Sequence, residues 1–381
     1  MRRWREAAGG VWESRLLGIL AATLAVFGVA AVYSASSIWS VQQGNPGSTY
    51  ALGQLLGLVV GVIILVVSSR MDYRRWRPLA WPLVAVTTVL LLILLLPFTH
   101  SIAPIINGAR RWIRVGPGTI QPSELAKFAV VLWVAMLAAK KGDDVREFKR
   151  GLVPFLVVVV PIAILIMLEP DLSTATVVLL LAATVLFTAG ARIGHFLLLG
   201  LLAIPLLWHE IVSVQYRLAR MVGFLSGGTD AAESSWQISQ SLTGIGAGRL
   251  VGVGFGEGLQ KLGYLQYAYS DFIFSTIGEE WGFLGVVTVL GLFGLYVALG
   301  FRIARNASDT FGLLLATGLT SMIGLATVLH IGVTLALIPT TGISLPFVSF
   351  GRSSLLIAFL ATGVIMSVAR YGGAGKRGAS R

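Results

Sequence analysis

Ten runs of predominantly apolar residues are spaced along the chain, and polar, charged or glycine-rich segments separate them. A helix needs about 20 such residues to cross the hydrocarbon core of a bilayer. The pattern therefore predicts an all-α, polytopic membrane protein with about ten transmembrane helices in one integral-membrane domain, residues 1–381. The eighth run is long enough to predict a tilted or extended helix. The predicted spans are residues 16–35, 51–68, 79–97, 122–139, 152–168, 173–191, 194–213, 271–301, 311–336 and 347–369.

The composition favours the same class of protein. Of the 381 residues, 56% are hydrophobic and only 12% are charged, which is about half the charged fraction of an ordinary soluble domain. The first apolar run follows several arginines and lacks a clear small-residue cleavage site, so we expect it to be a retained span. The chain has no cysteine, which excludes disulfides and thiolate metal sites.

Basic residues set the orientation of the predicted helices. Most of the 29 Lys and Arg residues fall in the segments that share a side with the N-terminus. The positive-inside rule then places both termini in the cytoplasm, as tails of residues 1–15 and 370–381. A large extracytoplasmic loop, residues 214–270, joins the seventh and eighth helices. Because the net charge of +12 reflects cytoplasmic loops, no nucleic-acid partner is expected.

Charged residues at or within the spans are candidates for function, because an ionisable group in a bilayer is costly. Glu124 and Lys127 lie three positions apart at the start of the fourth span, so they share a helix face. They either serve a site or form an ion pair that only locks the helices together. Glu169 and Asp171 lie in a tight outer turn, where helix capping explains one acid but not both.

Three arginines lie close together in 107-NGARRWIRVG-116. Arg110 and Arg111 precede Arg114 by four and three positions, so a short helix there would aim the guanidinium groups at one spot. The forked guanidinium group suits phosphate oxygens. The alternative is a surface helix in the headgroup layer, with Trp112 as its anchor.

Three carboxylates occupy the start of the eighth span. At about 100° per residue, Glu279 lies about 80° from Asp271 around a regular helix, and Glu280 lies opposite Asp271. The three therefore cannot serve one site. Asp271, where loop meets helix, is the candidate general base, and its alternative role is that of an acid favoured by the helix macrodipole. Glu279 and Glu280 are expected to position the helix.

Two motif classes are absent from the sequence. No Ser precedes a Lys by three positions, which excludes the S-x-x-K nucleophile of penicillin-binding proteins. No G-x-x-x-x-G-K-[ST] occurs, which excludes an ATP-driven pump of that type.

Seven segments, in this order and spacing, resemble the SEDS family, the FtsW/RodA peptidoglycan polymerases, over essentially the whole chain. Two of them, YSASS and QKLGYL, are more similar to the cell-division branch, FtsW, than to the elongation branch, RodA. The segments are 33-YSASS-37, 107-NGARRWIRVGPGTIQPSELAKF-128, 169-EPDLSTA-175, 236-WQISQSLTGIGAGRLVGVGFG-256, 260-QKLGYL-265, 271-DFIFSTIGEEWGFLG-285 and 339-PTTGISLPFVSFGRSS-354.

The resemblance implies ten membrane helices and an inverting glycosyltransferase that polymerises lipid II on the outer face of the bacterial cytoplasmic (inner) membrane, at the septum for the division branch. It implies a class B penicillin-binding protein, an FtsI-like transpeptidase, and other division proteins as partners. The family's essential aspartate falls on Asp271. The residues predicted to bind substrate are Arg110, Arg111, Glu124, Lys127, Lys261 and Ser349.

Two points of chemistry stay open at the sequence level. Charge on the leaving diphosphate would be stabilised by Arg110, Arg111 and Lys127 or by a divalent cation, Mg²⁺ or Mn²⁺. Asp271 is the first candidate ligand for such a cation, and no organic cofactor is expected. The chain also departs from the family pattern. It has 266-QYAYS-270 where P-E-x-H-T is frequent, and Arg352 where Gly is usual. The rival functions are a lipid II flippase, a scaffold for the penicillin-binding protein, and an elongation-type polymerase.

Overall fold

The computed structural model describes residues 2–99, 101–105, 108–116, 118–225 and 233–372. Within them, nine stretches are long and apolar enough to cross a membrane, and α6 is a shorter apolar helix. The prediction of about ten membrane helices is confirmed. These helices are α1 (Arg2–Gln42), α2 (Thr49–Arg70), α3 (Ala80–Leu95), α4 (Pro122–Lys141), α5 (Val153–Leu168), α6 (Leu172–Thr188), α7 (Ile193–Val212), α10 (Ile273–Arg305), α11 (Thr310–Thr334) and α12 (Arg352–Gly372).

The connections carry short elements. Two further helices and a 3₁₀ turn lie in the large loop between α7 and α10: α8 (Gln215–Leu225), α9 (Glu233–Ala247) and η4 (Gln260–Leu262). Short helical turns also connect α2 to α3 and α4 to α5. They are η1 (Tyr73–Leu79) in the first connection, and η2 (Gly142–Arg146) and η3 (Phe148–Leu152) in the second.

The arginine-rich segment does not form the predicted short helix. β1 (Ile113–Val115) pairs with β2 (Gly118–Ile120) as an antiparallel hairpin, with Ile113 opposite Ile120. Neighbouring side chains on a strand point to opposite faces, and Arg110 and Arg111 precede the strand. The interpretation that three guanidinium groups share one helix face is therefore wrong.

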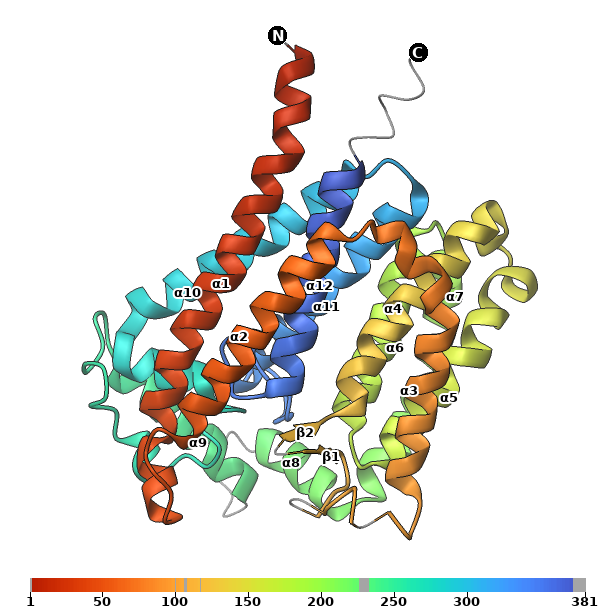
Figure 1. Ribbon diagram of the computed structural model, residues 1–381. Coiled ribbons are helices and arrows are strands. Elements are labelled where there is room, and N and C mark those ends of the chain that lie inside the picture. Colours follow the sequence, from red (N-terminus) through yellow and green to blue (C-terminus); the bar gives the residue numbers. More distant parts are fainter. Residues whose placement is uncertain (1, 100, 106–107, 117, 226–232, 373–381) are drawn as a thin grey trace.

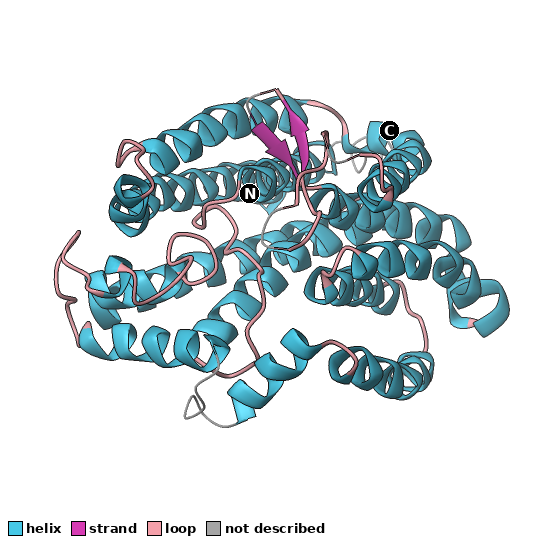
Figure 2. Cartoon of the chain, turned by 90° about the horizontal axis from the view of Figure 1, so that it is seen from below, coloured by secondary structure: helices cyan, strands magenta, loops and turns pink. Residues whose placement is uncertain are grey.

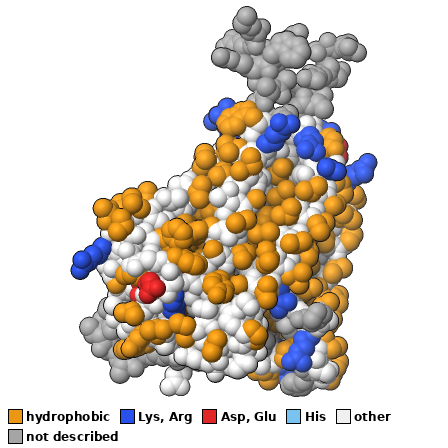
Figure 3. Space-filling model, turned by 60° about the vertical axis from the view of Figure 1, so that its left-hand side comes forward, with side chains coloured by type: hydrophobic (Ala, Val, Ile, Leu, Met, Phe, Trp, Pro, Cys, Tyr) orange, Lys and Arg blue, Asp and Glu red, His pale blue; other side chains and the backbone are white. Residues whose placement is uncertain are grey.

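The start of α1 and the end of α12 lie at the same end of the molecule, opposite the hairpin, α8 and α9 (Figure 1). A belt of hydrophobic side chains covers the sides of the helices, and Lys and Arg gather near the end where α1 begins (Figure 3). This distribution agrees with a cytoplasmic position for that end. We call the opposite end the outer end.

The membrane helices form two groups that meet along α11 and α12 (Figure 1). One group contains α1, α2, α10 and α12, and the other contains α3, α4, α5 and α6. Helix α4 is the most enclosed, since every residue from Ala126 to Met136 is buried. The two groups diverge towards the outer end (Figure 1). Seen from that end, loops and the hairpin lie over the helix ends (Figure 2).

Helix α10 is broken at Gly282, which explains the length of the eighth apolar run. Gly282 has φ 62° and ψ −161°, a conformation that is essentially restricted to glycine. The segment before the break, Ile273–Trp281, carries Glu279 and Glu280, and the segment after it continues to Arg305. The prediction of one extended helix is therefore corrected to two helical segments.

The outer loop supplies hydrogen bonds to the broken turn. In an uninterrupted helix, Phe283 and Leu284 would donate to the carbonyls of residues 279 and 280. Here their N–H groups donate to Arg249 and Leu250 (2.9 and 3.1 Å), and the two carbonyls accept from Val253 and Gly254 (3.0 and 3.2 Å). The break is thus stabilised by a loop segment about thirty residues earlier in the chain.

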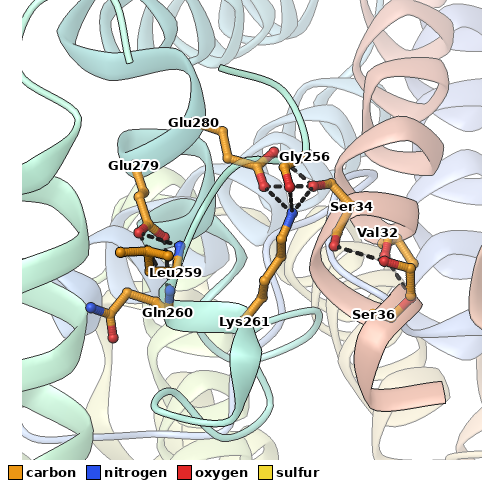
Figure 4. Close-up of polar contacts among 10 residues, drawn as sticks. Val32, Ser34, Ser36, Gly256, Leu259, Gln260, Lys261, Glu279 and Glu280 are labelled. Carbon is orange, nitrogen blue, oxygen red and sulfur yellow. Dashed lines mark hydrogen bonds and ion pairs between the residues drawn. The ribbon is translucent and has the colours of Figure 1, made fainter. Parts of the chain in front are cut away.

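Glu279 and Glu280 fasten the same loop through their side chains (Figure 4). Glu279 accepts from the N–H groups of Leu259 (2.8 Å) and Gln260 (3.3 Å). Glu280 forms an ion pair with Lys261 at 2.8 Å and accepts from Ser34 of α1 at 2.5 Å. The ion pair is deeply buried, with 4% and 1% of the Lys261 and Glu280 side chains exposed. The two acids hold α1, the loop and α10 together.

The fit of the loop against the break can be tested with two glycines that have the same φ. Gly252 and Gly256 both have φ +85°, but a Cβ on Gly252 would lie 2.6 Å from Trp281 N, whereas no described atom lies within 4 Å of a Cβ on Gly256. Alanine at either position bears left-handed strain of about 1–2 kcal/mol. Gly252→Ala should cost about 1–3 kcal/mol more, because it also overpacks the break. The apparent Tm of the two purified variants measures the difference, and equal values would contradict the fit.

The buried ion pair gives a second stability prediction. Lys261→Met leaves the Glu280 carboxylate buried without its cation and should cost about 3–5 kcal/mol. The double variant Lys261→Met/Glu280→Gln removes both charges and keeps a partner for Ser34, so it should recover part of that loss. Glu257→Gln is the matched control, since Glu257 is exposed on the same loop and should change stability by less than about 0.5 kcal/mol. Thermal unfolding that ranks Lys261→Met with the control would refute this role of the pair.

Candidate functional site

A cavity of about 880 Å³ lies at the outer end of the molecule, between the two helix groups. Six segments line it: the hairpin region, the turn between α5 and α6, helix α8, helix α9, the loop before α10, and the segment that leads into α12. Asp271 is among the lining residues. The segments come from widely separated parts of the sequence, so the site exists only in the folded chain.

Asp271 lies two residues before α10, at the end of a tight turn. Its N–H donates to Tyr267 at 3.0 Å, and Tyr267 has a positive φ of 54°. Ser349 holds this turn from outside the cavity: its hydroxyl donates to the Ser270 carbonyl at 2.6 Å and accepts from Leu345 N–H at 2.9 Å. Ser349 was predicted to bind substrate, but the structure places it behind the Asp271 turn.

The environment of Asp271 changes its acidity. Burial raises the pKa of the Asp271 carboxyl from 3.8 to about 6. A hydrogen bond from Ser270 and the charges of Arg220 and Arg111 act in the opposite direction, and Asp171 adds a small further rise in the pKa. A carboxylate whose pKa lies near the working pH is suited to general base catalysis.

Arg111 lines the cavity, whereas Arg110 does not. The Arg111 guanidinium donates to the carbonyls of Glu169 (3.2 Å) and Pro170, which fixes it against the turn between α5 and α6. Arg110 instead donates to Leu96 at the end of α3, at 2.9 Å. The structure therefore separates two neighbouring arginines that the sequence analysis assigned to one anion site.

The two acids of the α5–α6 turn have different environments. Asp171 caps α6 by accepting from Thr174 N–H (3.0 Å) and the Thr174 hydroxyl (2.9 Å), and it also lines the cavity. Glu169 is buried, and neither carboxyl oxygen has a hydrogen-bond partner among the described residues. Burial, with a contribution from Asp171, raises the pKa of Glu169 to about 9 against the opposing effect of Arg111. This environment favours the protonated form of Glu169 at neutral pH.

Glu124 and Lys127 form an ion pair at the outer end of α4, which was the alternative to their predicted role in substrate binding. Lys127 Nζ lies 2.7 Å from Glu124 Oε1, and 9% and 10% of the Lys127 and Glu124 side chains are exposed. Neither residue is among the described residues that line the cavity. Lys261, Glu279 and Glu280 are also outside the lining, in the network around the α10 break. Of the predicted site residues, the cavity brings together Asp271, Arg111 and Asp171.

Sequence reasoning missed other polar residues of the cavity. Arg220, from α8, lines it and donates to the Thr340 carbonyl at 3.4 Å. The sequence showed it only as one basic residue in the large loop. Arg352, noted in the sequence without a role, also lines the cavity. Further lining residues, which lie in segments that the sequence analysis quoted without giving them a role, are Gln237, Gln266, Tyr267, Tyr269 and Ser344.

The donor set of the cavity limits the metal sites that the chain can form alone. The described residues contain no group of three or more His, Cys, Asp or Glu side chains that could hold a metal ion. Asp171 and Asp271 are the carboxylates of the described cavity lining, and Asp171 is already engaged by Thr174. Magnesium is commonly bound by one or two carboxylates together with substrate phosphates, so Asp271 fits a shared site of that kind.

Comparisons with known proteins agree over nearly the full chain. The family model for cell cycle proteins of the FtsW/RodA/SpoVE type matches residues 14–373. The "Probable peptidoglycan glycosyltransferase FtsW" of Trichlorobacter lovleyi is 38% identical over 353 residues, covering 93% of this chain and 92% of that protein. The "Stage V sporulation protein E" of Bacillus subtilis is 39% identical over 356 residues, covering 93% and 96%.

A solved structure has the same arrangement. A chain from a peptidoglycan synthase complex, studied for its coordination of polymerization and crosslinking, superposes with a TM-score of 0.76. It is 29% identical and covers 93% of this chain and 97% of its own length. Together with the ten membrane helices and the outer cavity, these matches place the chain in the FtsW/RodA/SpoVE (SEDS) family.

Proposed function

We propose that this chain polymerises lipid II into glycan strands on the outer face of the cytoplasmic membrane, with Asp271 as the general base. Family membership and relatives named peptidoglycan glycosyltransferases support the reaction class. The observation that carries the catalytic assignment is the position of Asp271 in the outer cavity, where burial raises its pKa to about 6 and two arginines face it.

In the proposed reaction, the Asp271 carboxylate accepts the proton of the acceptor sugar's 4-hydroxyl as that oxygen attacks the anomeric carbon of the donor. The new glycosidic bond forms as the bond to the polyprenyl diphosphate breaks on the opposite face, which inverts the configuration. Negative charge then develops on the leaving diphosphate. Arg111 and Arg220, the cations that act on Asp271, are placed to stabilise that charge.

The other predicted binding residues act at a distance in this scheme. Arg110 and Lys127 were expected to contact the diphosphate, but they bond Leu96 and Glu124. We assign them to holding the hairpin region and the start of α4 in place. Mg²⁺ or Mn²⁺, if required, would be held by Asp271 and phosphate oxygens, and would offset charge on the leaving group.

We propose that the chain acts in cell division. The chain is a multi-pass membrane protein, and several relatives are named FtsW. A matching solved chain belongs to a complex that couples polymerization and crosslinking, which supports a penicillin-binding protein as partner. We assign that partner to the class B, FtsI-like transpeptidases, with the septum as the location. Polymerisation of labelled lipid II by the purified chain with its partner tests the activity, and failure to lengthen glycan strands would refute it.

Asp271→Asn tests the base. The amide keeps the shape of the side chain but cannot accept the proton, so the rate of polymerisation should fall by about 100-fold or more. Thermal stability and co-purification with the partner serve as controls and should stay near parental values. Near-parental glycan synthesis by a stable Asp271→Asn variant would exclude this role.

The pH dependence provides an independent test of the same residue. Because the pKa of Asp271 is raised to about 6, the carboxylate form is lost as the pH falls through that value. The rate should therefore decline below pH 6 by about tenfold per pH unit. With an ordinary aspartate as the base, the same decline would begin only near pH 4. Initial rates from pH 5 to 8, with stability monitored in parallel, check this. A rate that stays constant down to pH 5 would count against it.

A further inference from the structure

Arg352 lines the cavity next to the membrane helix α2. It is the first residue of α12 and lines the same cavity as Asp271. Its side chain passes between α2 and the hairpin: a Cβ on Gly57 would lie 3.7 Å from Arg352 Cγ, and one on Gly118 would lie 3.4 Å from Arg352 Nη1. The guanidinium group thus lies where α2, α12 and β2 meet.

The Arg352 side chain forms no hydrogen bond or ion pair within the described part of the chain. The other arginines around the cavity differ in this respect. Arg111 is fastened to Glu169 and Pro170, Arg110 to Leu96, and Arg220 to Thr340. Arg352 is partly buried and retains all five of its N–H donors for another molecule.

Structural stabilisation does not account for Arg352. A cation at the N-terminus of a helix opposes the macrodipole, because that end already carries partial positive charge. The tie between α12 and the hairpin is made by the next residue, Ser353, whose hydroxyl accepts from Gln121 N–H at 3.0 Å. Neither the helix nor its contact with β2 therefore needs a guanidinium group at this position.

The Arg352 side chain extends from the level of α2 towards the hairpin. Gly57 lies eight residues into α2, which starts at Thr49 near the outer end, so the stem of Arg352 lies about 12 Å along the helix at 1.5 Å per residue. The guanidinium end lies beside Gly118 of the hairpin, so the side chain extends outward from that level and places its charge at the cavity. Arg352 thus presents its charge to the same cavity that Asp271 lines.

We propose that Arg352 binds the diphosphate of a polyprenyl-linked substrate at the membrane edge of the cavity. The inference rests on the proposed function and names a further binding residue for it. A polyprenyl diphosphate carries its charge between an apolar chain and a sugar, which matches a cation between the membrane side and the Asp271 side of one cavity. The forked guanidinium group can donate two parallel hydrogen bonds to phosphate oxygens.

The test compares Arg352→Gln and Arg352→Lys with Arg249→Gln. Arg249 is an exposed arginine of the outer loop that does not line the cavity, so its variant controls for the loss of one positive charge. Two quantities are measured: KM and kcat for lipid II with the partner present, and the binding of undecaprenyl diphosphate to the purified protein. Thermal stability is followed for each variant.

Arg352→Gln should raise KM and weaken undecaprenyl diphosphate binding by about tenfold, as expected for one lost charge-assisted bond of about 1.5 kcal/mol. The kcat should change by less than about threefold, Arg352→Lys should restore part of the binding, and Arg249→Gln should bind normally. A structural role would instead lower stability and kcat together.

Unchanged diphosphate binding by Arg352→Gln would overturn the proposal, even if KM rises, because the group recognised would then lie elsewhere on the substrate. If the parental chain proves inactive on lipid II, the proposed function fails. The binding measurement still decides the role of Arg352, since it does not depend on turnover. Should Arg352→Gln be unstable, the Lys variant decides: parental binding affinity with a single point charge would argue against the forked contact.

Discussion

Backbone groups inside a bilayer must find partners within the protein, because lipid offers none. This requirement is most demanding at Gly282, where α10 is broken. The loop segment Arg249–Gly254 meets it by bonding to both sides of the break. Without those bonds, the last carbonyls before the break and the first N–H groups after it would be unsatisfied at a cost of several kcal/mol each. The position of the first α10 segment, and of the Asp271 turn in front of it, depends on this arrangement.

The Asp271 turn is consequently held from two directions. On one side, the loop and the acids Glu279 and Glu280 fix the α10 segment that follows the turn. On the other side, Ser349 and Phe350 bond the carbonyls of Ser270 and Tyr269. A general base needs this kind of rigid support, since a misplacement of about 1 Å can lower the rate by about 100-fold. Several polar residues near the site thus contribute by positioning and not by contact with substrate.

Hydropathy predicted the helices of this protein well, because about 20 apolar residues in series have few other solutions. The sequence analysis included the ion pair between Glu124 and Lys127 as an alternative to substrate binding, because that pair depends only on spacing along one helix. The features that were missed depend on distant segments. The hairpin places Ile113 opposite Ile120, a pairing that depends on the turn between the two strands. The break at Gly282 depends on backbone hydrogen bonds from a segment about thirty residues earlier in the chain. The sequence analysis predicted that Lys261 binds substrate, whereas the fold pairs it with Glu280.

The two fastenings of the outer loop limit how its length can change. Its earlier part is bonded to the backbone of Glu279 and Glu280, and its later part is bonded to the side chains of the same two residues. The chain between Gly254 and Lys261 therefore leaves α10 and returns to the same place, so its residue count is set by geometry. Most surface loops accept insertions and deletions during evolution. This one is expected to drift in sequence at exposed positions such as Glu257 while keeping a constant number of residues.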